Sequence, residues 1–127
     1  MPQITVSMHG PFFTAAAPAA IKDAMSDTVR ELVAEGESRV QLQLYPGHGL
    51  ITGHYRRSIH GEVLGPFSGT VHDSLVVYGP WLEGVSSRNE RSRFKGYAMF
   101  RNAFQQLQRI AQDVADKHVR RAVKKID

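Results

Sequence analysis

A helical repeat of apolar residues near the C-terminus constrains the fold of this chain more than any other sequence feature. Between Tyr97 and Lys125, residues suited to burial recur every three or four positions, at Phe100, Ala103, Phe104, Leu107, Ile110, Ala111, Val114 and His118. This spacing places them on one face of a single long helix. We therefore expect a C-terminal helix over residues 97–125 that buries one face against the rest of the protein.

A second long helix is expected in the N-terminal half. Pro18 is suited to a first helical turn, and residues suited to burial then recur at helical spacing at Ile21, Met25, Val29, Leu32, Val33, Gly36, Val40 and Leu44. The last part is ambiguous, because Val40, Leu42 and Leu44 also alternate with glutamines as they would in a strand. We favour helix to about Leu44.

The remaining regular structure is expected to be a small sheet. Ile4, Val6 and Met8 alternate with polar residues, which indicates a short strand or an extended arm within residues 1–15. Three further strands are predicted from β-branched and aromatic residues, at Ile59–Val63, Phe67–His72 and Ser74–Tyr78. We expect the run from Leu75 to Val77 to be the most buried of these.

The expected fold class is α+β, with a small antiparallel sheet of three to four strands packed against two long helices. The 127 residues form one domain, long enough to bury a core. Thr52 is placed to cap a short helical turn that runs to Ser58. No internal repeat or domain boundary is apparent.

Composition excludes several classes of protein. The chain has no cysteine, so it has neither a disulfide framework nor a thiolate metal site nor a cysteine nucleophile. Its start lacks the positive segment of a secretory signal, and no apolar run reaches the roughly 18 to 20 residues needed to span a bilayer. We expect a soluble protein without membrane contact, compatible with a reducing cytoplasm.

Positive charge is concentrated in the last third of the chain. Residues 1–87 contain 5 Lys/Arg and 8 Asp/Glu, whereas residues 88–127 contain 11 and 4. The end of the last helix is especially basic, with Lys117, Arg120, Arg121, Lys124 and Lys125. This stripe is expected to face DNA, bound nonspecifically through its phosphates, or an acidic protein surface.

Large apolar side chains lie beside a long charged segment in the middle of the chain. The single tryptophan, Trp81, is read equally well as core or as an interface anchor. Residues 84–95 are expected to form a long charged loop that is solvated in the free subunit and orders on assembly, its arginines pairing with Glu83 or with a neighbour. The predicted subunit-interface residues are Tyr78, Trp81, Leu82, Glu83, Arg88, Arg91, Arg93, Phe94 and Tyr97, together with Arg56 and Arg57.

No catalytic or cofactor motif is evident. The six histidines lack the spacing of a zinc site, and the glycines at 47 and 49 lack the further glycine and the lysine of a phosphate loop. Ser58, His60 and Asp73 form the one set that invites comparison with a hydrolase triad, but no nucleophile elbow surrounds the serine. We expect no enzymatic activity, metal or cofactor.

Three segments together resemble a family of small tail-component proteins from long-tailed bacteriophages. They are Thr52-Gly53-His54-Tyr55-Arg56-Arg57-Ser58-Ile59, Tyr78-Gly79-Pro80-Trp81-Leu82-Glu83-Gly84 and Gly96-Tyr97-Ala98-Met99-Phe100-Arg101, and the likeness runs from about residue 16 to residue 126. It implies a structural virion protein of the neck, the junction between head and tail. It also implies that Tyr55 and Ile59 are packing residues that hold their turn against the sheet.

The resemblance further implies partners and a location. The expected partners are copies of the chain in a closed ring, the head connector, and the tail terminator or tail tube, with DNA passing through. The expected location is the virion, after assembly in the host cytoplasm. Two other hypotheses remain: a nonspecific nucleic-acid-binding accessory protein that uses the basic last helix, and a small hydrolase that depends on Ser58.

Overall fold

The computed structural model describes residues 2–7, 19–44 and 50–126, and in these residues the fold class is α+β, as the sequence predicts. The elements follow one another as β1 (Gln3–Ser7), α1 (Ala19–Leu42), α2 (Leu50–Ser58), β2 (His60–Gly65), β3 (Ser68–His72), α3 (Gly79–Glu83), α4 (Ser87–Arg91) and α5 (Met99–Ile126). Several residues named above lie outside the described residues. They are Met8 with the rest of the expected arm to residue 15, Pro18, and the glycines at 47 and 49.

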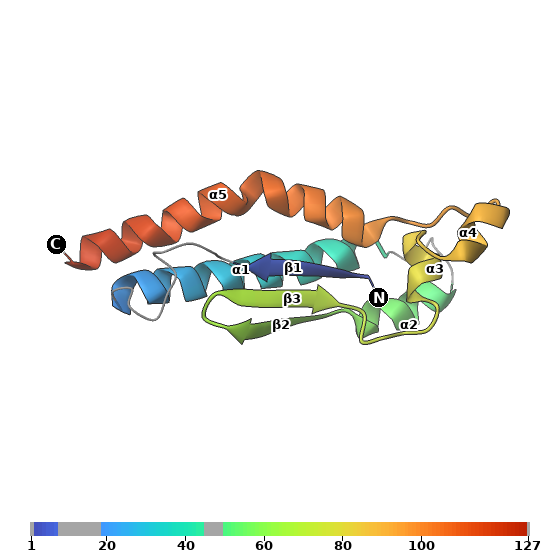
Figure 1. Ribbon diagram of the computed structural model, residues 1–127, viewed down its shortest axis with the longest axis horizontal. Helices are drawn as coiled ribbons and strands as arrows, with labels where there is room; N and C mark the ends of the chain where they lie inside the picture. The colour runs from blue at the N-terminus through green and yellow to red at the C-terminus, as the bar shows by residue number, and fades with distance from the viewer. Residues whose placement is uncertain (1, 8–18, 45–49, 127) are drawn as a thin grey trace.

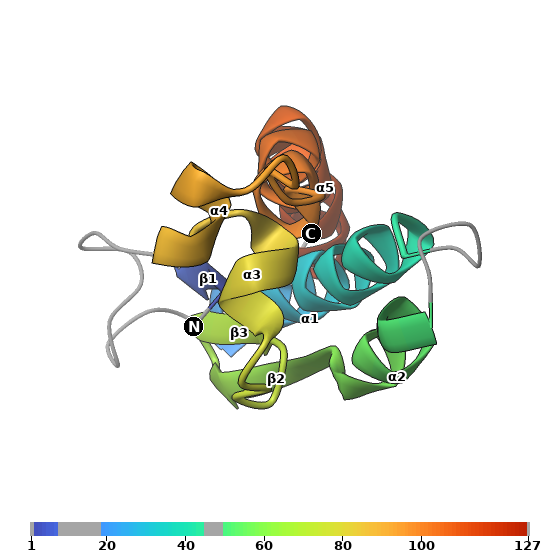
Figure 2. The same cartoon turned by 90° about the vertical axis from the view of Figure 1, so that its right-hand side faces the viewer.

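The two long helices run antiparallel along the length of the molecule (Figure 1). α1 is the central element, because it contacts α5 on one side and all three strands on the other (Figure 2). Its buried residues recur at helical spacing from Ala24 to Val40, which confirms helix where the sequence also allowed a strand. Both predicted long helices are therefore present, and they share one interface.

Two glycines allow α1 to lie close to its neighbours. A Cβ atom on Gly69 of β3 would lie 2.5 Å from Val33 Cγ2. A Cβ atom on Gly36 of α1 would lie 3.0 Å from Val71 Cγ2 and 3.1 Å from Leu107 Cδ1. The missing side chains therefore set the spacing between the sheet, α1 and α5.

The sheet has the order β1-β3-β2, and both pairings are antiparallel. β1 joins the chain's own sheet, where Ile4 lies opposite Val71 and both side chains are buried. The strand predicted for Ser74–Tyr78 is absent. Those residues form turns, so the third strand comes from the N-terminus.

One main cluster of buried side chains holds α1, α2, the sheet and the first half of α5 together. It includes Tyr55 and Ile59, whose side chains are 0% and 1% exposed, as the sequence likeness implies. A second cluster lies toward the end of α5, where Ala122 packs with Ala24 and Met25 of α1. The end of the last helix stands out in the sequence only by its basic residues, but Ala122 continues the contact with α1 there.

Candidate interaction surfaces

The aromatic side chains predicted as interface anchors pack on one another within the subunit. The ring centroids of Trp81 and Phe94 are 5.1 Å apart, and those of Phe94 and Tyr97 are 5.0 Å apart. These three rings and Tyr78 are half-buried against the main cluster, while Leu82 is buried within it. Leu82 therefore offers no surface to a neighbour, and only the outer parts of the aromatic rings remain open to one.

The predicted loop at residues 84–95 is folded. It contains α4, whose first turn is closed by a capping box in which Ser86 and Asn89 satisfy each other's backbone N–H groups. The Asn89 side chain is buried and donates to the carbonyl oxygens of Trp81 and Phe94, each at 3.1 Å. Local caps and one buried amide thus order a segment that we expected to order only on assembly.

Glu83 is a helix cap, not a partner for the arginines of this segment. Its carboxylate is buried and accepts hydrogen bonds from the backbone N–H groups of Phe100 at 3.0 Å and Arg101 at 2.9 Å, at the start of α5. Burial raises the pKa of Glu83 above its ordinary value, and the two backbone N–H groups oppose that shift only in part. Glu83 thus makes these contacts within the subunit, and its predicted interface role stays a prediction.

A buried polar pair links α2 to the turn after β3. The Tyr55 hydroxyl donates to Asp73 Oδ2 at 2.7 Å, and both side chains are fully buried. Asp73 Oδ1 accepts from the Leu75 backbone N–H at 3.1 Å. Burial, followed by the neighbouring Asp73, raises the pKa of the Tyr55 hydroxyl, which therefore stays protonated as a donor.

The three residues that suggested a hydrolase are not connected to one another. The Ser58 hydroxyl donates to the His54 carbonyl oxygen at 3.3 Å, while Asp73 is bonded to Tyr55. The ring centroid of His60 lies 6.5 Å from the ring centroid of His72, and His60 is exposed to solvent. No base therefore orients Ser58, although the absence of enzymatic activity stays a prediction.

The residues after Asp73 form a projecting apolar turn, which we call the 74–77 loop. Ser74 and Leu75 have φ angles of 60° and 61°, in the left-handed region that residues other than glycine rarely adopt. Leu75 is 73% exposed and Val77 is 95% exposed, whereas Val76 packs against the main cluster. The sequence predicted this run as the most buried strand, because an apolar run by itself does not reveal a turn.

The predicted interface arginines lie on the surface. Arg56 and Arg57 are exposed on α2. Arg88, Arg91 and Arg93 are exposed on and after α4, and the ion pairs found among the described residues include none of these five guanidinium groups. They remain predicted partner contacts.

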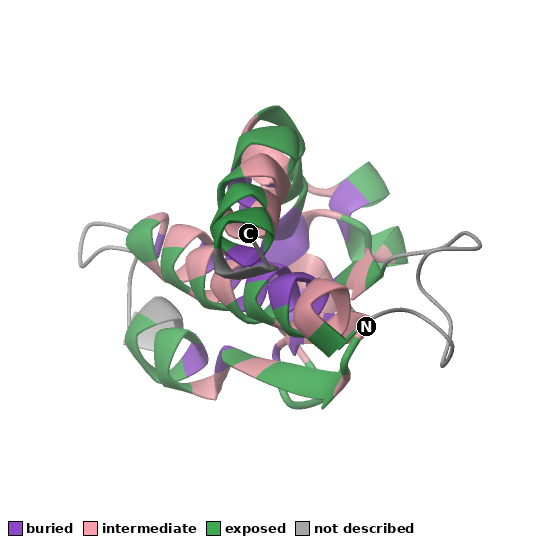
Figure 3. Ribbon diagram, turned by 90° about the vertical axis from the view of Figure 1, so that its left-hand side faces the viewer, coloured by how far each residue is buried: buried purple, intermediate pink, exposed green. Residues whose placement is uncertain are grey.

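The basic end of α5 contains both charge signs. Lys117 Nζ lies 2.6 Å from Glu31 Oε1 of α1, and His118 Nε2 lies 3.2 Å from the same atom. The hydrogen bond from Lys117 is the main reason that the pKa of Glu31 is lowered. Exposed Arg120, Arg121 and Lys124 line a shallow hollow together with Asp113 and Asp116, on a helix whose outer face is open to solvent (Figure 3). The side chain of Lys125 is not among those described.

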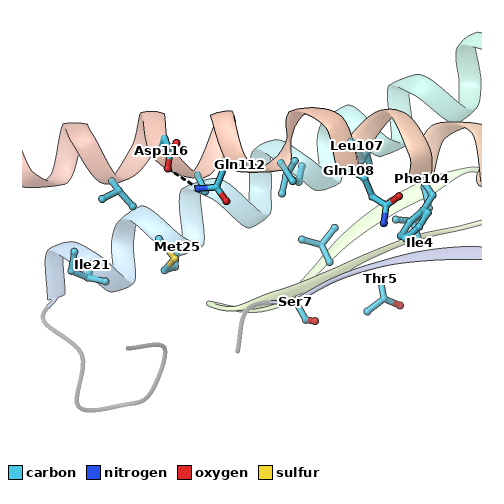
Figure 4. A pocket seen from close by; sticks show the side chains of 15 residues that line it. Ile4, Thr5, Ser7, Ile21, Met25, Phe104, Leu107, Gln108, Gln112 and Asp116 are labelled. Atoms are coloured by element: carbon cyan, nitrogen blue, oxygen red, sulfur yellow. Dashed lines mark hydrogen bonds between the residues drawn. The ribbon is translucent and has the colours of Figure 1, made fainter. Parts of the chain in front are cut away.

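An apolar groove that sequence reasoning missed runs between α1, α5 and β1. Its volume is about 800 Å³, and its walls include Ile4 of β1, Ile21 and Met25 of α1, and Phe104 of α5 (Figure 4). Asp116 is the single charged residue among the described residues that line the groove, and its carboxylate accepts a hydrogen bond from Gln112 Nε2 at 2.9 Å. The helical stripes predicted burial for most of these apolar residues and could not show that packing leaves a gap between them.

In the ranges given above, no cluster of three or more His, Asp or Glu side chains is arranged to hold a metal ion. Likewise, no helix in that part of the chain has the length and apolar character to cross a membrane. The chain matched no protein-family model, no curated protein and no solved structure.

Proposed function

We propose that this chain is a structural subunit of a tailed bacteriophage, repeated as a closed ring in the neck that joins the head connector to the tail and lets DNA pass. It acts by binding alone. Its partners are further copies of itself and the proteins above and below the ring, the connector and the tail terminator or tail tube.

The observation that carries this proposal is that two segments of the sequence likeness meet in one site. The Tyr55 ring of the first segment lies 5.9 Å from the Tyr78 ring of the second, and the His54 ring lies 6.4 Å from the same ring. Tyr55 and Ile59 are buried, while Arg56 and Arg57 point to the surface side of α2. A buried frame with exposed cations supports a binding role.

The third segment supports the same role. It begins α5, and its first turn is capped by Glu83 of the second segment through Phe100 and Arg101. The residues that the likeness singles out thus build one end of an elongated molecule (Figure 1). They brace that end internally, and the hydrogen bonds found among their described side chains do not connect a nucleophile to a base.

Assembly with phage particles tests the proposal. Purified protein is added to extracts of a phage that lacks this gene product, and joined particles are counted by negative-stain electron microscopy and by plaque titre. Restored joining, with rings or with a discrete oligomer of the pure protein by sedimentation, is the expected result. A protein that stays monomeric at every concentration and restores no joining would overturn the proposal.

The second candidate function is nonspecific binding of duplex DNA by the end of α5. The exposed side chains of Arg120, Arg121 and Lys124 favour it, although Asp113 and Asp116 in the same hollow reduce the local positive charge. The test is binding to a labelled duplex across a salt series, with Arg120, Arg121, Lys124 and Lys125 all replaced by Gln. The control replaces Arg101 and Arg109, two exposed arginines elsewhere on α5.

For this second function, the fourfold variant should bind more weakly and show a shallower dependence on salt, because fewer counterions are released. The control variant should bind as the wild type does. Equal binding by all three proteins would exclude DNA recognition through this end of the helix.

A further inference from the structure

The 74–77 loop is held in an unfavourable shape by several hydrogen bonds. Its first two residues, Ser74 and Leu75, are both left-handed, and two such residues in a row persist only where surrounding contacts impose them. The Leu75 backbone N–H donates to the Asp73 carboxylate, and the Ser74 hydroxyl donates to the Ser58 carbonyl oxygen at 2.8 Å. The Ser74 backbone N–H donates to His72 Nδ1 at 2.9 Å. A histidine is therefore one of the groups that fix the loop.

These contacts define where His72 carries its proton. A backbone N–H can only donate, so the Nδ1 atom that faces Ser74 must offer a lone pair. The proton of the ring is then on Nε2, which lies 3.1 Å from Glu62 Oε1 on β2 and donates to it. The neutral ring thus joins the loop on one side to β2 on the other.

Protonation of His72 would affect its two contacts in opposite ways. A second proton on Nδ1 would face the Ser74 N–H, so two donors would meet and this hydrogen bond would be lost. The contact of Nε2 with the Glu62 carboxylate would remain and become an ion pair. Histidine is the side chain that ordinarily changes charge between about pH 5 and about pH 8, so mild acid is enough to make this exchange.

The ionisable groups that face His72 come from β2. Glu62 favours the charged ring, whereas His60, whose ring centroid is 6.5 Å away, opposes it when it is itself protonated. His60 and His72 are partners in the antiparallel register, so both side chains lie on the same face of the sheet. The charge of His72 therefore depends on two neighbours with opposite effects.

The other elements beside His72 contribute less. β1, which pairs with the other edge of β3, has no ionisable side chain within Gln3–Ser7. α1 packs on the opposite face of the sheet, against Val71. The Asp73 carboxylate is bonded to Tyr55 and to the loop. The ionisable residues of α2 besides Tyr55 take no part in the ion pairs of the described residues, and they are His54, Arg56 and Arg57.

We propose that His72 is a pH-sensitive switch of the 74–77 loop. The neutral ring accepts from Ser74 and holds the left-handed turn, whereas the protonated ring keeps Glu62 and releases Ser74, so that the turn relaxes. The switch changes how Leu75 and Val77 are presented, which at 73% and 95% exposed are the two most exposed large apolar residues of the described chain. All of these contacts lie within one subunit, so the switch does not depend on the proposed ring.

NMR of the isotope-labelled full chain, across the range from about pH 5 to about pH 8, tests the switch. The shifts of the ring nitrogens report the tautomer and the charge of His72, and the heteronuclear NOE of the backbone amides reports the order of residues 74–77. At the alkaline end we expect the proton on Nε2 and an ordered loop. The NOE values of the loop should fall as His72 becomes charged. A proton on Nδ1 at the alkaline end, or a loop that stays equally ordered beside a charged His72, would overturn the inference.

Two substitutions of His72 separate the switch from a general effect of pH. His72→Asn puts an amide oxygen near the position of Nδ1, where it can accept from Ser74 but cannot be protonated, so the loop should stay ordered throughout the range. His72→Gln carries its amide farther out and leaves the Ser74 N–H without this acceptor, so the loop should be loose throughout. His60→Gln is the matched control and should respond to pH as the wild type does. A response lost in His60→Gln would assign the titration to His60 and overturn the inference.

Cleavage by chymotrypsin after Leu75 gives a readout that does not depend on the size of any oligomer. The wild type and His72→Asn are compared at each pH, which cancels the pH dependence of the protease. Cleavage of the wild type relative to His72→Asn should be several times faster at the acid end of the range than at the alkaline end. An equal ratio at both ends would also overturn the inference.

Discussion

At the scale of single residues, a few buried polar groups shape the end of the molecule that carries the likeness. Tyr55 and Asp73 exchange one hydrogen bond in a fully buried site, and Asp73 also fixes the turn that follows it. Asn89 and Glu83 act similarly, since each satisfies two backbone groups of other segments. Buried polar side chains of this kind cost free energy if they lose a partner, so they impose one arrangement of the backbone.

The Tyr55→Phe variant tests this role. It removes the hydroxyl that donates to Asp73 and leaves a buried carboxylate less well satisfied. We expect the free energy of unfolding to fall by about 1–3 kcal/mol, measured by urea denaturation at pH 7. Tyr78→Phe is the control, because that half-exposed ring makes no hydrogen bond through its hydroxyl within the described residues, and it should change stability by less than about 0.5 kcal/mol. Equal losses would contradict the explanation.

At the scale of elements, the contacts of α1 with the sheet and with α5 depend on side chains that are absent or small. Gly69 and Gly36 lie where α1 packs against the sheet and α5. Toward the other end of the two helices, the small side chains of Ala122 and Ala24 lie together in one buried cluster between α5 and α1. Close packing of this kind leaves little room for added volume.

Two glycine substitutions should have opposite signs. Gly69→Ala places a Cβ atom 2.5 Å from Val33 Cγ2 and 3.0 Å from the Glu62 carbonyl oxygen, so we expect a loss of about 1–3 kcal/mol in unfolding free energy. Gly53→Ala on α2 meets nothing within 4 Å and replaces a poor helix former, so a gain of about 0.5–1 kcal/mol is expected. Thermal and urea unfolding would measure both, and a neutral Gly69→Ala would disprove the close contact.

The pairing of Glu31 with α5 predicts a pH-dependent stability. Lys117 lowers the pKa of Glu31 through its hydrogen bond, burial opposes the shift, and His118 adds to the lowering. A carboxyl group whose pKa is lower in the folded state contributes stability above its ordinary value of 4.5 and loses it as pH falls through the folded value.

We therefore expect Glu31→Gln to cost about 0.5–1 kcal/mol at pH 7, a small value because the pair is partly exposed. This difference in the free energy of unfolding should disappear as the pH falls toward 3. Urea denaturation at each pH measures it. Glu35→Gln is the control, because the ion-pair partner of Glu35 is Arg39, a residue of the same helix, α1. A difference that does not depend on pH would show that the charge of Glu31 is not its cause.

At the scale of the whole molecule, the folded segment at residues 84–95 changes how assembly should be tested. Deleting residues 86–93 would remove α4 and Asn89, which fastens Trp81 to Phe94 through their carbonyl groups. Such a deletion would disturb the subunit itself. Point substitutions of the exposed arginines leave this frame in place.

Replacing Arg88, Arg91 and Arg93 together with Gln should leave the unfolding temperature nearly unchanged, because all three side chains are exposed and outside the ion pairs of the described residues. If the proposed ring uses them against carboxylates of a neighbour, the same variant should restore fewer joined particles in the complementation assay. Full restoration would remove these arginines from the interface. A large fall in unfolding temperature would instead assign them a role within the subunit.

The sequence by itself determined the elements whose pattern repeats along the chain. Helical spacing of apolar residues is a local property, so it identified α1 and α5 and most of the face that each buries. Phe104 is an exception, because it was predicted to be buried and is 43% exposed. Alternation indicated a strand or an extended arm where β1 lies, and a short helical turn before Ile59 was expected. However, α2 begins at Leu50, so Thr52 lies inside this helix and is not the N-cap that the sequence predicted. The α+β class follows from these elements together.

Only the tertiary structure decided how non-neighbouring groups are used. Leu75 and Val77 have the composition of a buried strand, yet Asp73, Tyr55 and Ser58 bend that run into an exposed turn. Glu83 is charged, yet it is buried because the start of α5 supplies two N–H donors to it. The groove lies between α1, α5 and β1, which are distant in sequence. The fit between such segments depends on their packing in three dimensions, which periodicity along one segment does not encode.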